Sequence, residues 1–160
     1  MTIQVGDKIP SVKLMHWGET GPEAITTDAL FSGKTVAIFG VPGAFTPTCS
    51  EKHLPGFVEH ADELKSKGVD SIVCTAVNDV FVMRAWGKDQ NVGDKVLMVA
   101  DGDAELTTAT GLELDLKGKG LGLRCQRFSM LVKDGVVEQI YVDPAGAFEQ
   151  TKAETLLATL

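Results

Sequence analysis

The fold is predicted above all by residues 34–77, which read KTVAIFGVPGAFTPTCSEKHLPGFVEHADELKSKGVDSIVCTAV. Residues 34–41 are mostly β-branched and aromatic, a composition typical of a buried strand. Apolar side chains at helical spacing predict a helix over residues 48–67, and Gly68 supplies its C-terminal stop. Because residues 69–77 form a second apolar run, the stretch is predicted to be a strand–helix–strand unit with a right-handed crossover.

The alternation of strands and helices continues on both sides of this unit. Buried strands that alternate with helices predict an α/β fold, which a C-terminal hairpin makes mixed. The order fits a thioredoxin-like fold with a mixed central sheet flanked by helices, although a flavodoxin-like sheet has similar periodicity. The length of 160 residues predicts a single domain over 1–160. The further expected elements are a small hairpin around 12–17, a helix over 80–88 capped by Asn78 or Asp79, a strand over 95–100, a helix over 103–110, a long connection over 111–123, a hairpin of strands 127–133 and 136–142 across Asp134-Gly135, and a closing helix over 149–160.

The charge and hydropathy of the chain argue against two classes of partner. Its formal net charge of −7 disfavours binding to nucleic acid or to an anionic membrane through a general electrostatic field. The longest apolar runs, such as residues 35–41, are far too short to cross a bilayer. No basic segment leads into an apolar stretch at the N-terminus, so we expect no secretory signal and a cytoplasmic location.

The cysteine count narrows the chemistry. The chain has three cysteines, Cys49, Cys74 and Cys125, an odd number that makes a structural disulfide framework unexpected. None of them forms a C-x-x-C pair, which disfavours both a zinc site and a dithiol oxidoreductase. The histidines do not stand at metal-ligand spacing from the cysteines. This spacing disfavours a metal site.

One cysteine occupies a position that favours ionisation. Thr46 is a preferred N-cap residue and Pro47 fits the first helical position, which places Cys49 third in the helix. The Thr46 hydroxyl is expected to accept a hydrogen bond from an amide of this turn. The positive end of the helix dipole favours a thiolate at Cys49. The alternative for a lone cysteine is a small buried apolar residue, which the cap–proline–cysteine spacing disfavours.

Two separated blocks carry a resemblance to a known family. Residues 42–49 have the pattern Pro-x-x-x-Thr-x-x-Cys, which matches the active-site signature of the peroxiredoxins. The fuller run VPGAFTPTCS over 41–50, followed by HLPGF over 53–57, resembles the peroxiredoxin 5 subfamily, which includes the plant type II enzymes. The RFSM block over 127–130 is similar to a second block of that subfamily. The resemblance extends over nearly the whole chain.

The resemblance implies a role for each matched residue. Cys49 would attack hydrogen peroxide or an organic hydroperoxide and become a sulfenic acid, a reaction that needs no metal and no organic cofactor. Thr46 would hydrogen-bond the thiolate or the peroxide, and Pro42 would shield the sulfur. Arg127 would stabilise the thiolate and the charge that moves to the leaving oxygen. Without the block, Arg127 would be a solvated strand residue; Arg124 is a nearby alternative, less favoured because only Arg127 directly precedes Phe-Ser-Met.

Two other residues of the predicted helix have alternative interpretations. His53 lies four residues after Cys49 on the same face, so a Cys–His nucleophile pair is conceivable, but a hydrogen-bonded structural histidine is favoured. Pro55 cannot donate to the carbonyl of Glu51 and should bend or weaken the helix. This weakening either fits a bent helix to its sheet or lets the first turn unfold separately, so that oxidised Cys49 becomes accessible.

The regeneration of oxidised Cys49 is left open between two mechanisms. Cys74 occupies the position of the second cysteine of the plant type II enzymes, which implies a possible resolving disulfide with Cys49. A disulfide requires Cα atoms within about 7 Å, and a cysteine on a strand is held in place. The alternative is a one-cysteine mechanism in which glutathione or glutaredoxin reduces the sulfenic acid; thioredoxin is a further possible reductant. Cys125 is treated as incidental.

The resemblance also implies a homodimer, to which Phe45, Phe81 and Trp86 could contribute. The alternating residues Leu112, Leu114 and Leu116 are either core or one wall of a peroxide pocket.

Taken with the resemblance, the sequence predicts a thiol-dependent peroxidase. The alternative on the same fold is a peroxide-responsive redox sensor or regulatory protein, in which oxidation of Cys49 is a signal and not part of turnover.

Overall fold

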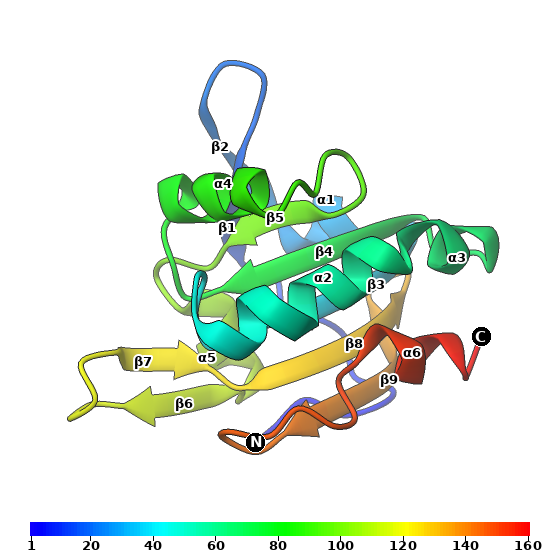
Figure 1. The fold of residues 1–160 in the computed structure, drawn as a ribbon. Coiled ribbons are helices and arrows are strands. Elements are labelled where there is room, and N and C mark those ends of the chain that lie inside the picture. The colour runs from blue at the N-terminus through cyan, green and yellow to red at the C-terminus, as the bar shows by residue number, and fades with distance from the viewer.

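A mixed sheet of seven strands organises the computed structural model, which describes residues 1–160 (Figure 1). Its strands follow the order β2-β1-β5-β4-β3-β8-β9, in which β3, β4 and β5 are parallel and the outer pairs are antiparallel. The predicted α/β fold with a mixed central sheet is thus confirmed. The strands are β1 (Lys13–Trp17), β2 (Pro22–Thr26), β3 (Thr35–Gly40), β4 (Ser71–Ala76), β5 (Leu97–Ala100), β8 (Arg127–Lys133) and β9 (Val136–Asp143).

Helices cover both faces of the sheet, because alternate residues of its central strands are apolar on each side. Phe39 of β3 packs into a core beneath α2, α3, α4 and α6, whereas Ile38 packs into a second core beneath α1 and α5. No helix is long and apolar enough to span a membrane. The helices are α1 (Thr27–Phe31), α2 (Leu54–Glu59), α3 (Ala61–Ser66), α4 (Val80–Asp89), α5 (Glu105–Thr110) and α6 (Ala153–Leu157).

Several local predictions are confirmed at their boundaries. Asp79 caps α4 by accepting a hydrogen bond of 2.9 Å from the amide of Val82. The β8–β9 hairpin turns at Asp134 and Gly135, whose φ angles of 49° and 78° are the left-handed values of a tight two-residue turn. The predicted N-terminal hairpin is present as β1 and β2.

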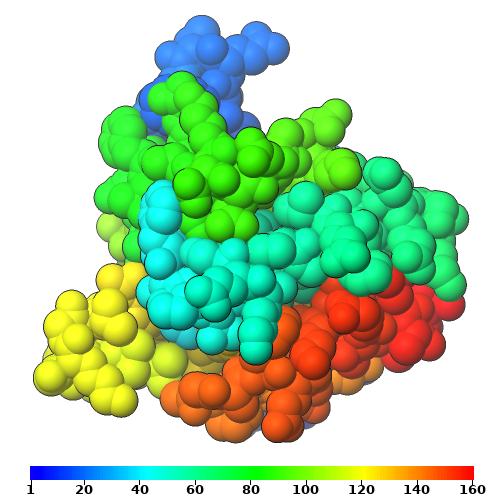
Figure 2. All heavy atoms as spheres, viewed as in Figure 1, coloured from blue at the N-terminus to red at the C-terminus, as the bar shows by residue number.

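The segment expected as a long connection contains a second sheet, so that prediction was wrong. Strands β6 (Glu113–Leu116) and β7 (Gly122–Cys125) form an antiparallel hairpin, whose tip projects from the body of the molecule (Figures 1 and 2). The leucines at 112, 114 and 116 alternate as a half-exposed strand does, but the glycines that follow them indicated a flexible loop. Gly118 and Gly120 lie in the turn and Gly122 begins β7, and all three have positive φ.

Three further expectations differ from the structure. The single helix predicted over 48–67 is divided at His60, where the φ and ψ angles of −96° and 10° leave the helical range. The closing helix is limited to α6, because the preceding residues form a loop anchored at Asp143. Trp86, considered for a dimer contact, is fully buried, and its indole nitrogen donates to the Ser50 hydroxyl over 3.0 Å.

Candidate active site

The helix that carries Cys49 begins where the sequence predicts. Helical residues start at Pro47, and the carbonyl of Thr46 accepts the first intrahelical hydrogen bond, 2.9 Å from the amide of Ser50. Cys49 is therefore the third helical residue, in the turn whose amides have no carbonyl partner inside the helix. The positive end of the backbone dipoles lies at this turn and stabilises negative charge on the sulfur.

The Thr46 hydroxyl does not cap this helix as expected. It donates a 2.7 Å hydrogen bond to the carbonyl of Gly43 instead of accepting one from an amide. The reason is the tight turn over residues 43–46, in which Phe45 has a φ of 65° and the amide of Thr46 also approaches the Gly43 carbonyl. Since the hydroxyl proton is committed to Gly43, the oxygen of Thr46 keeps its lone pairs free to accept a hydrogen bond.

A π-helical turn over Cys49–His53 follows, and Pro55 explains it. The amide of Leu54 donates to the carbonyl of Cys49, five residues earlier, instead of four. Pro55 has no N–H with which to continue the α-helical pattern to Glu51, so the turn widens before α2 continues. The predicted interruption is confirmed, whereas separate unfolding of this turn stays a prediction.

Arg127 at the start of β8 lies directly against the sulfur. Its Nη2 donates to the Sγ of Cys49 over 3.2 Å, although the two residues are 78 positions apart in the sequence. Cys49 is fully buried and Arg127 is only 8% exposed, so little water weakens the interaction between the guanidinium and the sulfur. The alternative residue, Arg124, donates instead to the carbonyls of Leu121 and Pro42.

His53 binds the other terminal nitrogen of the same guanidinium. Its Nδ1 accepts from Nη1 of Arg127 over 2.9 Å, and its Nε2 donates to the carbonyl of Thr151 over 3.0 Å. Burial, followed by the positive charge of Arg127, lowers the pKa of His53 from 6.5 to about 3. A neutral imidazole matches both hydrogen bonds. His53 is thus hydrogen-bonded, as favoured from the sequence, and forms no hydrogen bond with Cys49.

A loop after β9 that is anchored at Asp143 carries the carbonyl to which His53 donates, and the sequence did not predict this loop. The carboxylate of Asp143 pulls this loop together, which sets the position of the Thr151 carbonyl beneath the imidazole. Burial opposes ionisation of Asp143, but four hydrogen bonds that its carboxylate accepts from residues 149–151 outweigh this effect and hold the pKa of Asp143 below its usual value. The Asp-Pro pair at the end of a strand is the signal that could have indicated a structured loop. The donors to Asp143 are the amides of Glu149, Gln150 and Thr151 and the hydroxyl of Thr151, the last over 2.7 Å.

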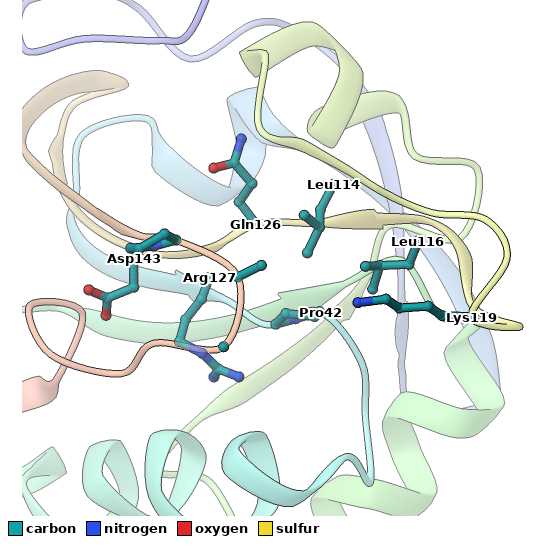
Figure 3. A pocket seen from close by; sticks show the side chains of 10 residues that line it. Pro42, Leu114, Leu116, Lys119, Gln126, Arg127 and Asp143 are labelled. Atoms are coloured by element: carbon teal, nitrogen blue, oxygen red, sulfur yellow. The ribbon is translucent and has the colours of Figure 1, made fainter.

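Pro42 lies beside Arg127 at the wall of a cavity near the sulfur (Figure 3). Leu114 and Leu116, on one side of strand β6, line the same cavity, whose other side is formed by Asp143 and the loop that follows it. Leu112 is separate from them, because it belongs to the core. The structure therefore brings Cys49 and Pro42 close to Arg127, and Thr46 lies one turn before Cys49 at the start of the same helix; their roles in catalysis stay a prediction.

The other two cysteines lie in environments that disfavour ionisation. Cys74 is fully buried in the middle of β4, where burial, and then the neighbouring sulfurs of Cys49 and Cys125, raise its pKa well above the usual value. Burial likewise raises the pKa of Cys125, whose thiol donates to the carbonyl of Gln126. All three cysteines are free thiols, and no group of three or more His, Cys, Asp or Glu side chains could hold a metal ion.

Comparison with known proteins agrees with this geometry. The model of the Redoxin family matches residues 4–157. Peroxiredoxin-2B of Arabidopsis thaliana is 50% identical over 159 residues, which cover 99% of this chain and 98% of that protein. The chloroplastic Peroxiredoxin-2E-2 of Oryza sativa subsp. japonica is 49% identical over 99% of this chain and 73% of its own length. Reduced Prx3 of Vibrio vulnificus, solved in complex with hydrogen peroxide, superposes with a TM-score of 0.95 at 49% identity, covering 99% of each chain.

The thioredoxin-like fold, the buried cysteine under an arginine and these full-length matches lead to one assignment. The chain belongs to the Redoxin family and is a peroxiredoxin, a thiol peroxidase of the peroxiredoxin-2 and Prx5 type.

Proposed function

We propose that Cys49 is the residue that attacks the peroxide, and one observation carries this assignment. Its sulfur is the cysteine sulfur that accepts a hydrogen bond from a guanidinium, at 3.2 Å from Arg127. Guanidinium stays protonated throughout the working pH range, so it stabilises a thiolate permanently. Cys74 and Cys125 have no such partner, and burial raises the pKa of both.

In the proposed reaction the Cys49 thiolate attacks the terminal oxygen of the peroxide. An S–O bond forms as the O–O bond breaks, and the sulfur is oxidised to a sulfenic acid while the peroxide is reduced. The leaving oxygen departs as hydroxide or alkoxide and takes up a proton, which gives water or an alcohol. The charge of Arg127 is already in place for the negative charge that develops on this oxygen.

Thr46 and Pro42 have supporting roles in this proposal. Because the Thr46 proton is donated to Gly43, its oxygen can accept a hydrogen bond from the O–H of the peroxide and orient it. Pro42 supplies no N–H and presents an apolar ring at the cavity beside Arg127. An apolar cover of this kind keeps competing water from the sulfur.

Mass spectrometry after one equivalent of hydrogen peroxide tests the assignment of the nucleophile. We expect one added oxygen on Cys49, and loss of peroxide consumption in Cys49→Ser with an unchanged far-UV circular dichroism spectrum. Retained peroxidase activity in Cys49→Ser would refute the role of Cys49. A single oxidation followed by arrest, despite excess thiol, would indicate the redox-sensor alternative.

For the return to the thiolate we favour an external thiol, glutathione with glutaredoxin, over an internal disulfide. The thiol of Cys74 is fully buried in a central strand, and burial raises its pKa, so little thiolate is available to attack a sulfenic acid. Thioredoxin could serve the same purpose from outside. In the presence of glutathione, we expect a mass increase for one glutathione on Cys49; a stoichiometric Cys49–Cys74 bridge would contradict this mechanism.

The expected homodimer also remains a proposal, supported by exposed aromatic side chains. Phe45, just before the Cys49 helix, is 51% exposed, and Phe81, on α4, is 61% exposed. Large exposed apolar groups of this kind are common at protein interfaces. Sedimentation analysis of the wild type and of Phe81→Ser tests the dimer. A cytoplasmic location stays a prediction from the N-terminal sequence.

A further inference from the structure

A cavity of about 220 Å³ lies on the side of Arg127 that faces the projecting β6–β7 hairpin. It is lined by Pro42, Leu114 and Leu116 on one side and by the loop over residues 143–146 on the other (Figure 3). One water molecule occupies about 30 Å³ in the liquid, so the cavity is several times larger than hydrogen peroxide requires. Its apolar walls are suited to an organic group.

The rim of this cavity carries a cation that has no partner within the protein. Lys119, at the hairpin tip, lines the cavity, and no carboxylate lies within 4.0 Å of its ammonium group. In Figure 3 its side chain points from the hairpin toward Pro42 and Arg127. The chain as a whole is acidic, with a net charge of −7, so a cavity with an unpaired lysine and a guanidinium is a local exception.

The single acidic residue of the cavity does not neutralise this cation. Asp143 lies at the opposite side from Lys119, and its carboxylate is turned away (Figure 3). Both of its oxygens already accept hydrogen bonds from the loop over residues 149–151. The negative charge is therefore engaged elsewhere, and Lys119 remains available to a bound anion.

We propose that this cavity selects organic hydroperoxides that carry a carboxylate, with Lys119 as the residue that binds the acid. The inference rests on the proposed function, because it requires Cys49 to react with the peroxide end. The hydrocarbon part would pack against Leu114 and Leu116, which lie on the same side of β6. The chemistry is unchanged: the terminal oxygen passes to Cys49, and the acid-bearing alkoxide takes up a proton and leaves as a hydroxy acid.

A carboxylate of the reductant is the other anion that Lys119 could attract. Glutathione is polar along its whole length, whereas Pro42, Leu114 and Leu116 offer few hydrogen-bond partners, so the apolar walls favour a hydroperoxide. The two sources act in different half-reactions, namely oxidation of Cys49 by peroxide and its reduction by thiol. Separate rate measurements therefore distinguish them.

The test compares ω-hydroperoxy carboxylic acids of increasing chain length with their methyl esters, and with hydrogen peroxide. Lys119→Gln removes the charge, Lys119→Arg keeps it, and Lys117→Gln is the matched control, since Lys117 is on the same hairpin but does not line the cavity. The wild type should oxidise Cys49 faster with the acid than with the ester. Lys119→Gln should reduce this preference about two- to fivefold, as expected for one partly exposed ion pair, and Lys119→Arg and Lys117→Gln should keep it.

The possible outcomes separate the two proposals. If hydrogen peroxide is consumed normally but the acid-to-ester ratio is one, or is unchanged in Lys119→Gln, the carboxylate site is refuted and the peroxidase assignment stands. If Lys119→Gln slows only the reaction of oxidised Cys49 with glutathione, the reductant is the anion and the inference is also overturned. If no peroxide oxidises Cys49 at all, the proposed function itself fails.

Discussion

Protonation of His53 should make the stability of this peroxiredoxin steeply dependent on pH below neutrality. The pKa of His53 is lowered from 6.5 to about 3 in the folded protein, chiefly by burial and then by the charge of Arg127. Between these two values the unfolded chain binds a proton at this side chain that the folded chain does not. The contribution of His53 to the free energy of unfolding is therefore fully present well above pH 6.5, and it is lost progressively as pH falls from about 6.5 toward 3.

The magnitude follows from the size of the shift. The slope approaches 1.4 kcal/mol per pH unit at most, and integration from pH 8 to pH 5 gives a loss of about 2 kcal/mol. This is a large part of the 5–15 kcal/mol that typically separates folded from unfolded proteins. Urea unfolding, followed by tryptophan fluorescence at pH 8, 6.5 and 5, measures the loss in the wild type.

His53→Gln is the variant that isolates this contribution. A glutamine can still donate to the Thr151 carbonyl and accept from Arg127, but it has no proton to gain in this range. All other titrating groups, including Asp143, are common to both proteins and largely cancel in the difference. If the two unfolding free energies change in parallel with pH, the neutral, doubly hydrogen-bonded state of His53 is wrong.

Three further predictions concern the reaction. Arg127→Met should slow the oxidation of Cys49 by hydrogen peroxide by about 10²-fold or more in stopped flow, because one preorganised charge is lost, whereas Arg124→Met should change it less than twofold; equal effects of the two would contradict the geometry. Thr46→Val should slow the same step about tenfold or more while Thr46→Ser retains it, since only the hydroxyl oxygen is required; a fast valine variant would remove Thr46 from the mechanism. Cys74→Ala should keep glutathione-dependent turnover within about twofold at a stability cost of about 1 kcal/mol, measured by coupled assay and urea unfolding; loss of turnover would establish Cys74 as the resolving cysteine.

The sequence predicted those features that depend on neighbouring residues. The strand–helix–strand unit follows from apolar periodicity, and the place of Cys49 in the helix follows from Thr46 and Pro47. The tight turn at Asp134-Gly135 could likewise be predicted, because these residue types tolerate positive φ. In these cases the path of the backbone follows local preferences, although the Thr46 hydroxyl itself does not cap the helix.

Features that depend on residues far apart in the sequence, or on the exact path of a turn, could not be derived in this way. The bonds from Arg127 to Cys49 and His53 span 78 and 74 residues, so only the family resemblance suggested the first and nothing suggested the second. The direction of the Thr46 hydroxyl depends on where one turn places the Gly43 carbonyl. In the β6–β7 hairpin, glycines that are typical of a flexible loop conceal a short pair of strands.

The π-helical turn has a consequence for any motion of the nucleophile. Its first residue is Cys49 and its last is His53, and both grip the same guanidinium through separate nitrogens. Unfolding of these five residues would remove the sulfur and the imidazole together, and Arg127 would lose both hydrogen bonds at once. Refolding of the turn would restore both hydrogen bonds together, so no form of the enzyme would have Cys49 but not His53 bound to Arg127.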